Sequence, residues 1–310
     1  MAIIKKDAYF VSSTGLEKIH CIIWQDDTLE PMGVFQIAHS TFEHLDRYDE
    51  FAKFLAESGL IVCGNDHLGH GGSVESEEDL GYISEKDGDL RLVDDMHILH
   101  NIMAKRYPTL PYFMFGHGFG SMCARVYASN FGDELSGLVL SGTGELPSAA
   151  VVVEKPLKFM CEKFGTKAEI PASIFDTLTN IGIKDKSTAK DWLTRDKQSV
   201  TEILLDPLCN FDFKLGGLRD IITLCNTACT DEWASLVPTS MQIMLISGAK
   251  DPIGFNGKGV INVCDNLEIF GHAPKVILYP GSRHNLLVEE EKQQVFCDVL
   301  EFLYSVGFNK

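Results

Sequence analysis

The sequence is poor in basic residues and has no long apolar runs. Its 27 Lys and Arg residues are outnumbered by 44 Asp and Glu residues, which gives a formal net charge of −17. Nucleic-acid binding needs clustered basic side chains that neutralise phosphates, so a nucleic-acid partner is not expected. The charge also disfavours adhesion to anionic membrane surfaces, although not contact with a neutral lipid. No apolar run approaches the ~20 residues of a spanning helix, so we expect no stable membrane insertion.

The cysteines have neither the spacing of a disulfide framework nor that of a zinc site. There are nine, an odd number, and no two form a Cys-x-x-Cys pair. Such usage is typical of reduced thiols in a cytoplasmic protein. The first residues reach Lys5 without the apolar core of a signal peptide, so we expect none. The sequence therefore predicts a cytoplasmic protein, and nothing in it indicates a metal or cofactor.

Strand and helix patterns alternate along most of the chain. This alternation predicts an α/β fold, with a mostly parallel central sheet and helices on both faces. Short apolar runs indicate strands at residues 7–12, 17–24, 33–38, 60–64, 112–116, 137–141, 241–247 and 275–279. Amphipathic patterns and glycine stops indicate helices at residues 47–58, 87–106, 120–131, 257–270 and 289–306.

The alternation stops between residues 145 and 236. This stretch has helical patches, such as 157–164 and 187–195, but no clear strand. We interpret residues 145–236 as a helical cap. The cap is inserted into one α/β core formed by residues 1–144 and 237–310.

The segment 112–121 has the layout of a nucleophile elbow. An apolar run ends in Gly-His-Gly-Phe-Gly, and a helical pattern follows. In the G-x-S-x-G elbow, a sharp strand-to-helix turn exposes a serine. The central position here is Gly118, which has no side chain to attack a substrate.

Two later strands are followed by an acid and a histidine. Asp251 follows the strand at 241–247, and His284 follows the strand at 275–279. This is the chain order of the α/β-hydrolase triad, in which the acid orients the imidazole that does the base chemistry. Either residue alone is typical of an ordinary loop, but their joint placement favours a catalytic dyad.

Taken together, these segments resemble α/β hydrolases of the monoacylglycerol lipase and lysophospholipase group, which are classed with the serine aminopeptidases. The match extends nearly end to end. Two segments, 191–196 and 206–209, resemble cap motifs of bacterial members. The other motifs that carry the resemblance are 39–48, 66–73, 116–120, 251–254 and 283–284.

The resemblance implies an α/β-hydrolase fold and a carboxylic-ester hydrolase site. Gly118 would hold the nucleophile position, with Asp251 and His284 as its partners. The oxyanion hole would consist of the backbone N–H groups of Thr41 and Phe119. The implied ligand is a small acyl ester or lipid-like molecule, such as a monoacylglycerol or lysophospholipid. The resemblance also implies loop-bracing roles for His39, Glu43, His44, His67 and His70.

The sequence departs from the family pattern at two positions near the nucleophile. Gly118 replaces the serine, and Ser40 stands where the family usually has glycine. Loss of a triad serine lowers turnover by about 10⁶-fold, so we expect the chain to be inactive or nearly so. An acyl-ligand-binding pseudoenzyme is one alternative. Another is a non-hydrolytic enzyme that uses the Asp251–His284 dyad as a general base.

Other reactive groups are given structural roles. Ser121 and Cys123 could be substitute nucleophiles, but their positions in the helix should turn them away from the oxyanion site. Asp94, His97 and His100 have the spacing of metal ligands on a helix. No other segment of the sequence converges on them, so we expect no metal site there.

Overall fold

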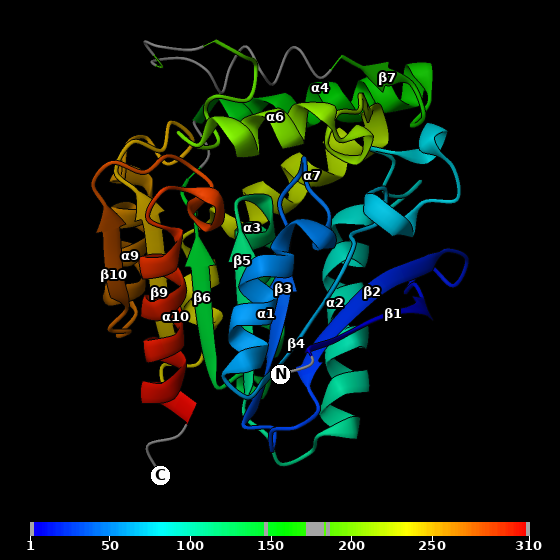
Figure 1. Ribbon diagram of the computed structural model, residues 1–310. Helices are drawn as coiled ribbons and strands as arrows, with labels where there is room; N and C mark the ends of the chain where they lie inside the picture. The colour runs from blue at the N-terminus through cyan, green and yellow to red at the C-terminus, as the bar shows by residue number, and fades with distance from the viewer. Residues whose placement is uncertain (1–2, 146–147, 172–182, 184–186, 308–310) are drawn as a thin grey trace.

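The computed structural model describes residues 3–145, 148–171, 183 and 187–307, except for the side chains of residues 148–151 (Figure 1). Its central sheet has eight strands in the order β1-β2-β4-β3-β5-β6-β9-β10. β1 and β2 are antiparallel, and the strands from β4 to β10 run parallel, which confirms the predicted mostly parallel sheet. The bounds are β1 Ile3–Val11, β2 Lys18–Asp26, β3 Gly33–Ala38, β4 Leu60–Asn65, β5 Tyr112–His117, β6 Gly137–Ser141, β9 Gln242–Gly248 and β10 Lys275–Tyr279.

Helices pack on both faces of this sheet. One face carries α1 (Asp49–Glu57) and α10 (Lys292–Gly307), and the other carries α2 (Gly88–Arg106), α3 (Phe119–Phe131) and α9 (Lys258–Ile269). Short 3-10 helices lie at Leu45–Tyr48, Gly71–Ser73, Glu77–Asp79, Gly132–Glu134, Pro207–Cys209 and Leu286–Val288.

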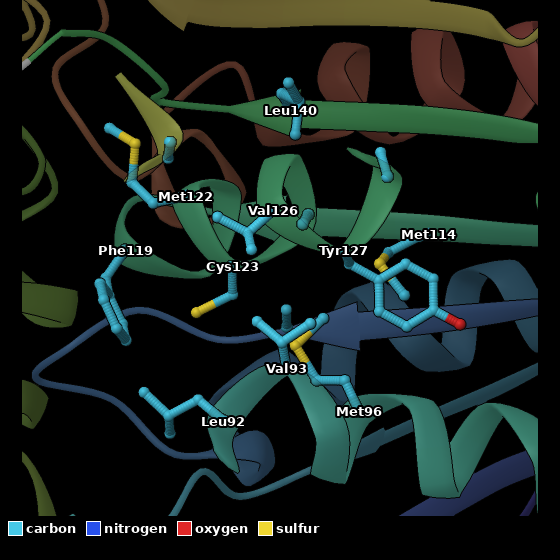
Figure 2. Packing of buried hydrophobic residues seen from close by; sticks show 14 of the residues in the cluster. Leu92, Val93, Met96, Met114, Phe119, Met122, Cys123, Val126, Tyr127 and Leu140 are labelled. Carbon is cyan, nitrogen blue, oxygen red and sulfur yellow. The ribbon is translucent and has the colours of Figure 1, made fainter. Parts of the chain in front are cut away.

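A hydrophobic cluster lies on each face of the sheet. Side chains of β5 contribute to both clusters because successive residues of a strand point to opposite faces. Phe113 and Phe115 join the cluster under α1 and α10, whereas Met114 joins the cluster under α2 and α3. Figure 2 shows Met114 in the second cluster, where Leu92 and Val93 of α2 face α3. β5 is therefore buried on both faces, which fixes the position of the residues at its carboxyl end.

The segment between β6 and β9 is mainly helical. α4 (Ser148–Phe164) and α6 (Lys197–Leu205) lie above the carboxyl ends of the strands in Figure 1. α7 (Leu215–Ala228) packs against α3 and α4, and α8 (Glu232–Leu236) packs against α3. Part of the proposed cap, at residues 146–147, 172–182 and 184–186, lies outside the described residues. Across the part of the chain that the structure describes, no helix has both the length and the apolar character needed to cross a membrane.

Two predictions for this segment are wrong. A two-strand ribbon, β7 (Glu169–Ile170) with β8 (Phe213–Lys214), is too short to give a strand pattern in the sequence. Residues 187–195 form turns instead of a helix. The Asp191 carboxylate accepts the backbone N–H of Ser187 at 2.5 Å, and such local side-chain bonds compete with helix formation.

Candidate active site

Gly118 forms the turn between β5 and α3. Its backbone angles are φ 53° and ψ −118°, a region that glycine adopts easily and other residues do not. Its N–H donates to the Ser141 carbonyl at 2.9 Å, and its carbonyl accepts the N–H of Ser121 at 3.0 Å. The strand, turn and helix that the sequence predicts are all present.

Gly120 brings this turn against the end of β3. A Cβ on residue 120 would lie 2.1 Å from the Ala38 carbonyl oxygen and 2.6 Å from the His39 carbonyl oxygen. Only glycine permits this approach without a shift of the backbone. The loop at residues 39–41 is thereby placed directly beside Gly118.

The Ser40 hydroxyl occupies the space beside the turn. Ser40 Oγ accepts the N–H of Phe119 at 3.3 Å. A Cβ on residue 118 would stand 2.4 Å from the same Oγ. One predicted oxyanion donor, Phe119, therefore already has a hydroxyl partner. The other, Thr41, lies in the same loop, and its carbonyl oxygen is 2.8 Å from His70 Nε2.

Asp251 and His284 meet at the carboxyl ends of β9 and β10. His284 Nδ1 and Asp251 Oδ2 are 2.9 Å apart, and both side chains are buried. The other carboxylate oxygen accepts the N–H of Ile253 at 2.8 Å. The free ring nitrogen, Nε2, lies 2.9 Å from the place of a Cβ on Gly118. The structure thus directs the imidazole at the elbow residue.

The surroundings of His284 raise the pKa of its imidazole. Burial lowers its pKa, but the charge and hydrogen bond of Asp251, together with the charge of Glu43, raise it above the ordinary value. The imidazolium is the form that an acid–histidine pair stabilises during proton transfer. The pair therefore has the electrostatic character of a catalytic dyad.

Glu43 joins the loop after β3 to the loop after β10. It accepts the Tyr48 hydroxyl at 2.7 Å and the Asn285 side-chain amide at 2.5 Å. Burial raises the Glu43 pKa, but the charge of His117 and the hydrogen bond from Tyr48 lower it below its usual value. This buried carboxylate therefore links the loop that carries Ser40 to the loop that carries His284.

His39 and His67 are buried, and burial favours their neutral forms. His39 Nε2 accepts the N–H of His67 at 2.9 Å, and His39 Nδ1 donates to the Ser40 carbonyl at 2.7 Å. Burial, with a smaller effect of His67, holds the pKa of His39 well below its ordinary value. Burial lowers the pKa of His67 to about 3. These contacts brace the two loops around the elbow.

His44 connects this region to the segment between β6 and β9. Its Nε2 lies 2.8 Å from a carboxylate oxygen of Asp206. Burial raises the pKa of Asp206, but the hydrogen bond and charge of His44 bring it below its usual value. Sequence reasoning places both residues in motifs but gives no signal that they pair, because 162 positions separate them.

Sequence reasoning also missed two neighbours of His284. The Trp192 ring lies against the imidazole, with ring centroids 5.1 Å apart. The backbone N–H of Asn285 donates to the Leu193 carbonyl at 2.7 Å. The motif at 191–196 therefore contacts the histidine loop directly, a relation that the sequence order does not reveal.

Ser121 and Cys123 have partners away from the dyad. Ser121 Oγ donates to the Gly118 carbonyl at 2.6 Å. Cys123 points toward Leu92 and Val93 in the core (Figure 2), and burial raises the pKa of its thiol well above the ordinary value. A buried, protonated thiol is a poor nucleophile.

Two groups in the described residues have the ligand types of a metal site: His97 with His100 and Glu134, and His44 with Asp206 and Cys209. One Glu134 oxygen lies 3.0 Å from His97 Nε2 and 3.1 Å from His100 Nδ1. The sequence gives no sign that Glu134 approaches the histidines. In the second group, burial raises the Cys209 pKa, which disfavours the thiolate that a metal needs. Neither group includes Asp251 or His284.

Comparison with known proteins agrees with this geometry. The family model described as serine aminopeptidase, S33, matches residues 30–291. The chain is 27% identical over 283 residues to a monoacylglycerol lipase of Mycolicibacterium smegmatis, which covers 91% of each protein. It is 23% identical to a monoglyceride lipase homolog of Monkeypox virus, over 93% of this chain and 94% of that protein.

A solved structure is also similar along the whole chain. A thermostable carboxyl esterase from Bacillus coagulans, in complex with glycerol, matches with a TM-score of 0.91 and 31% identity over 98% of this chain and 99% of the esterase. The fold and these matches define the class as α/β hydrolase, as predicted. Within that class, the chain belongs to the serine aminopeptidase S33 family.

Proposed function

We propose that this chain is a carboxylic-ester hydrolase scaffold that is inactive or nearly so because residue 118 cannot attack. The observation that carries the proposal is the position of His284 Nε2. It lies 2.9 Å from the place where a side chain on Gly118 would begin, and Asp251 holds its other ring nitrogen. A base aimed at that point is suited to deprotonate an elbow serine.

The other roles follow the same arrangement. Asp251 orients His284 and stabilises its protonated form. The N–H groups of Phe119 and Thr41 are the donors for the oxyanion of an ester transition state. Gly118 supplies no atom for an acyl-enzyme bond, so turnover through the elbow is expected to fall by about 10⁶-fold.

The substrate class that we propose is a monoacylglycerol-like or lysophospholipid-like ester. Two observations support it: the names of the relatives as lipases of monoacylglycerol, and the glycerol complex of the similar esterase. We assign residues 145–236 to the cap that would select the acyl chain. All nine cysteines are free thiols, which suits the reducing cytoplasm.

Restoring the nucleophile tests the scaffold. The serine-restored variant carries both Gly118→Ser and Ser40→Gly, because a Cβ at position 118 would lie only 2.4 Å from Ser40 Oγ. We expect this variant to react with a fluorophosphonate and to hydrolyse p-nitrophenyl butyrate. The matched control, Ser40→Gly with Gly118→Ala, should do neither. A folded serine-restored variant that is inert in both assays contradicts the hydrolase assignment.

A second candidate is a binding module for a carboxylate or acyl ester. The raised pKa of His284 makes its imidazole easier to protonate, and a protonated imidazole suits an anionic group at this site. Native mass spectrometry of the purified wild-type chain checks this candidate. A bound fatty acid that is lost in His284→Gln supports it, and a ligand-free chain after incubation with oleate contradicts it.

A further inference from the structure

We propose that Ser40 serves as a relocated nucleophile, so that the residual ester cleavage of this chain passes through residue 40. This inference rests on the proposed hydrolase function. It assigns a catalytic role to a residue at which the family pattern normally has glycine.

The first support is the shared position of two reactive atoms. Ser40 Oγ lies 2.4 Å, and His284 Nε2 lies 2.9 Å, from one point: the place of a Cβ on Gly118. The serine hydroxyl and the base therefore border the same small space. An elbow serine would begin at this point, and with glycine at position 118 the Ser40 hydroxyl stands next to it instead.

The second support is the way in which Ser40 is held. Its backbone N–H donates to Glu43 at 3.4 Å, and its carbonyl accepts the His39 ring N–H at 2.7 Å. The main chain is fixed by these partners, while the side chain has one rotatable bond. In this structure its Oγ accepts the Phe119 N–H. Rotation of the Ser40 side chain to another staggered rotamer would release that N–H to stabilise a substrate oxyanion.

Neighbouring nucleophiles are worse placed. Ser121 Oγ donates to the Gly118 carbonyl, and Cys123 is buried in the core with a raised thiol pKa. Ser40 as a whole is 7% exposed. Among these three residues, Ser40 alone borders the space that His284 faces.

The reaction follows ordinary acyl transfer. Ser40 Oγ attacks the ester carbonyl carbon as its proton passes to His284 Nε2. The carbon–oxygen bond to the alcohol then breaks, and the alcohol leaves with that proton. Water next attacks the acyl-serine and gives a proton to His284. The carboxylic acid departs as Ser40 regains its proton, while Asp251 stabilises the imidazolium throughout.

The cleavage should be slow. A displacement of about 1 Å from productive geometry can lower a rate by about 10²-fold. Ser40 must also exchange its hydrogen bond with Phe119 for one with His284. We therefore expect kcat/KM of the wild type to be about 10²–10⁴-fold below that of the serine-restored variant.

The test is the location of a fluorophosphonate adduct on the full-length wild type. Trypsin places Ser40 in the peptide 19–47 and the elbow in the peptide 107–125, so mass spectrometry distinguishes them. We expect the adduct on Ser40, its loss in Ser40→Ala and in His284→Ala, and its retention in Ser121→Ala. Slow p-nitrophenyl butyrate hydrolysis should follow the same pattern.

The possible negative results separate a failure of the Ser40 role from a failure of the proposed hydrolase function. An unlabelled wild type beside a labelled serine-restored variant overturns the role of Ser40 and leaves the scaffold assignment standing. A fluorophosphonate adduct on the peptide 107–125 of the wild type also overturns the role of Ser40. If neither protein is labelled although both are folded by circular dichroism, the proposed hydrolase function fails and this inference fails with it.

Discussion

The two halves of the candidate site are preserved to different degrees. In the acid–histidine half, Asp251 and His284 are buried, paired at 2.9 Å and supported through Glu43. In the nucleophile half, Gly118 has no side chain, and Ser40 Oγ lies 2.4 Å from the place of a Cβ on residue 118. The elbow backbone nevertheless keeps its turn, because that turn depends on a positive φ and on the contact of Gly120. Backbone geometry and side-chain chemistry can therefore be separated at this site.

Removal of the acid should have the largest effect. In the serine-restored variant, Asp251→Asn should lower kcat by about 10⁴-fold, because an asparagine amide favours the wrong tautomer of the histidine. Hydrolysis of p-nitrophenyl butyrate measures the change. The matched control is Asp133→Asn, at an exposed position, which should leave the rate unchanged. A fall of less than tenfold in Asp251→Asn would mean that another group orients His284.

The turn itself should break at Gly120. In Gly120→Ala the new Cβ meets the Ala38 carbonyl at 2.1 Å, so the backbone must shift. We expect the free energy of unfolding to fall by about 3 kcal/mol or more. Gly144→Ala is the control, since its Cβ would have no neighbour nearer than 3.6 Å. Urea denaturation compares the two, and equal stability of the variants would contradict the close contact.

Restoring serine alone should destabilise the nucleophile half. Gly118→Ser introduces strain at φ 53° and a contact with Ser40 Oγ, so the free energy of unfolding should fall by about 1–3 kcal/mol. Adding Ser40→Gly should recover part of this loss. A double-mutant cycle of the free energies of unfolding, measured by urea denaturation, gives the coupling energy. A Gly118→Ser variant at least as stable as the wild type would disprove the clash.

The smallest expected effect is on the pH dependence of the free energy of unfolding, to which His67 and His284 contribute with opposite signs. Burial lowers the pKa of His67 to about 3, so below pH 6.5 the unfolded chain binds a proton there that the folded chain does not. The free energy of unfolding should therefore fall on acidification by up to about 1.4 kcal/mol per pH unit from this group. His67→Gln should show a shallower decline in urea denaturation between pH 7 and pH 5. An unchanged slope would mean that His67 is protonated in the fold.

His284 should behave in the reverse way. Its folded pKa is raised, so its contribution to stability is complete below the unfolded pKa and is lost as pH rises through the folded pKa. The stability difference between wild type and His284→Gln should therefore be larger at pH 5.5 than at pH 9. A difference that grows with pH would contradict the raised pKa.

The sequence was sufficient to predict the sheet and the pairing of its later loops. Buried parallel strands appear as short apolar runs, and their carboxyl ends share one edge. That geometry is why Asp251 and His284 could be expected to meet although 33 positions separate them. Gly118 was recognised by its flanking glycines, which the turn needs for steric reasons.

Contacts between side chains of distant segments could not be predicted. The approach of Glu134 to His97 and of Asp206 to His44 depends on how segments pack, which has no local pattern in the sequence. The turns at 187–195 formed because Asp191 bonds the nearby backbone, whereas the apolar spacing favoured a helix. Ser40 was visible as an unusual residue, but only the fold places its hydroxyl beside Gly118, across 79 positions from Phe119.

The contact between Ser40 and residue 118 also means that the order of the substitutions Ser40→Gly and Gly118→Ser matters. Ser40→Gly first removes the hydroxyl, so a later Gly118→Ser meets only the strain of the turn and the His284 ring, whose Nε2 lies 2.9 Å from the new Cβ. The reverse order passes through a chain in which both side chains compete for one space. An elbow serine is therefore easier to reach when Ser40→Gly comes first than when Gly118→Ser comes first. Libraries that vary residue 118 alone would sample the harder route and undercount the scaffolds that can regain hydrolysis.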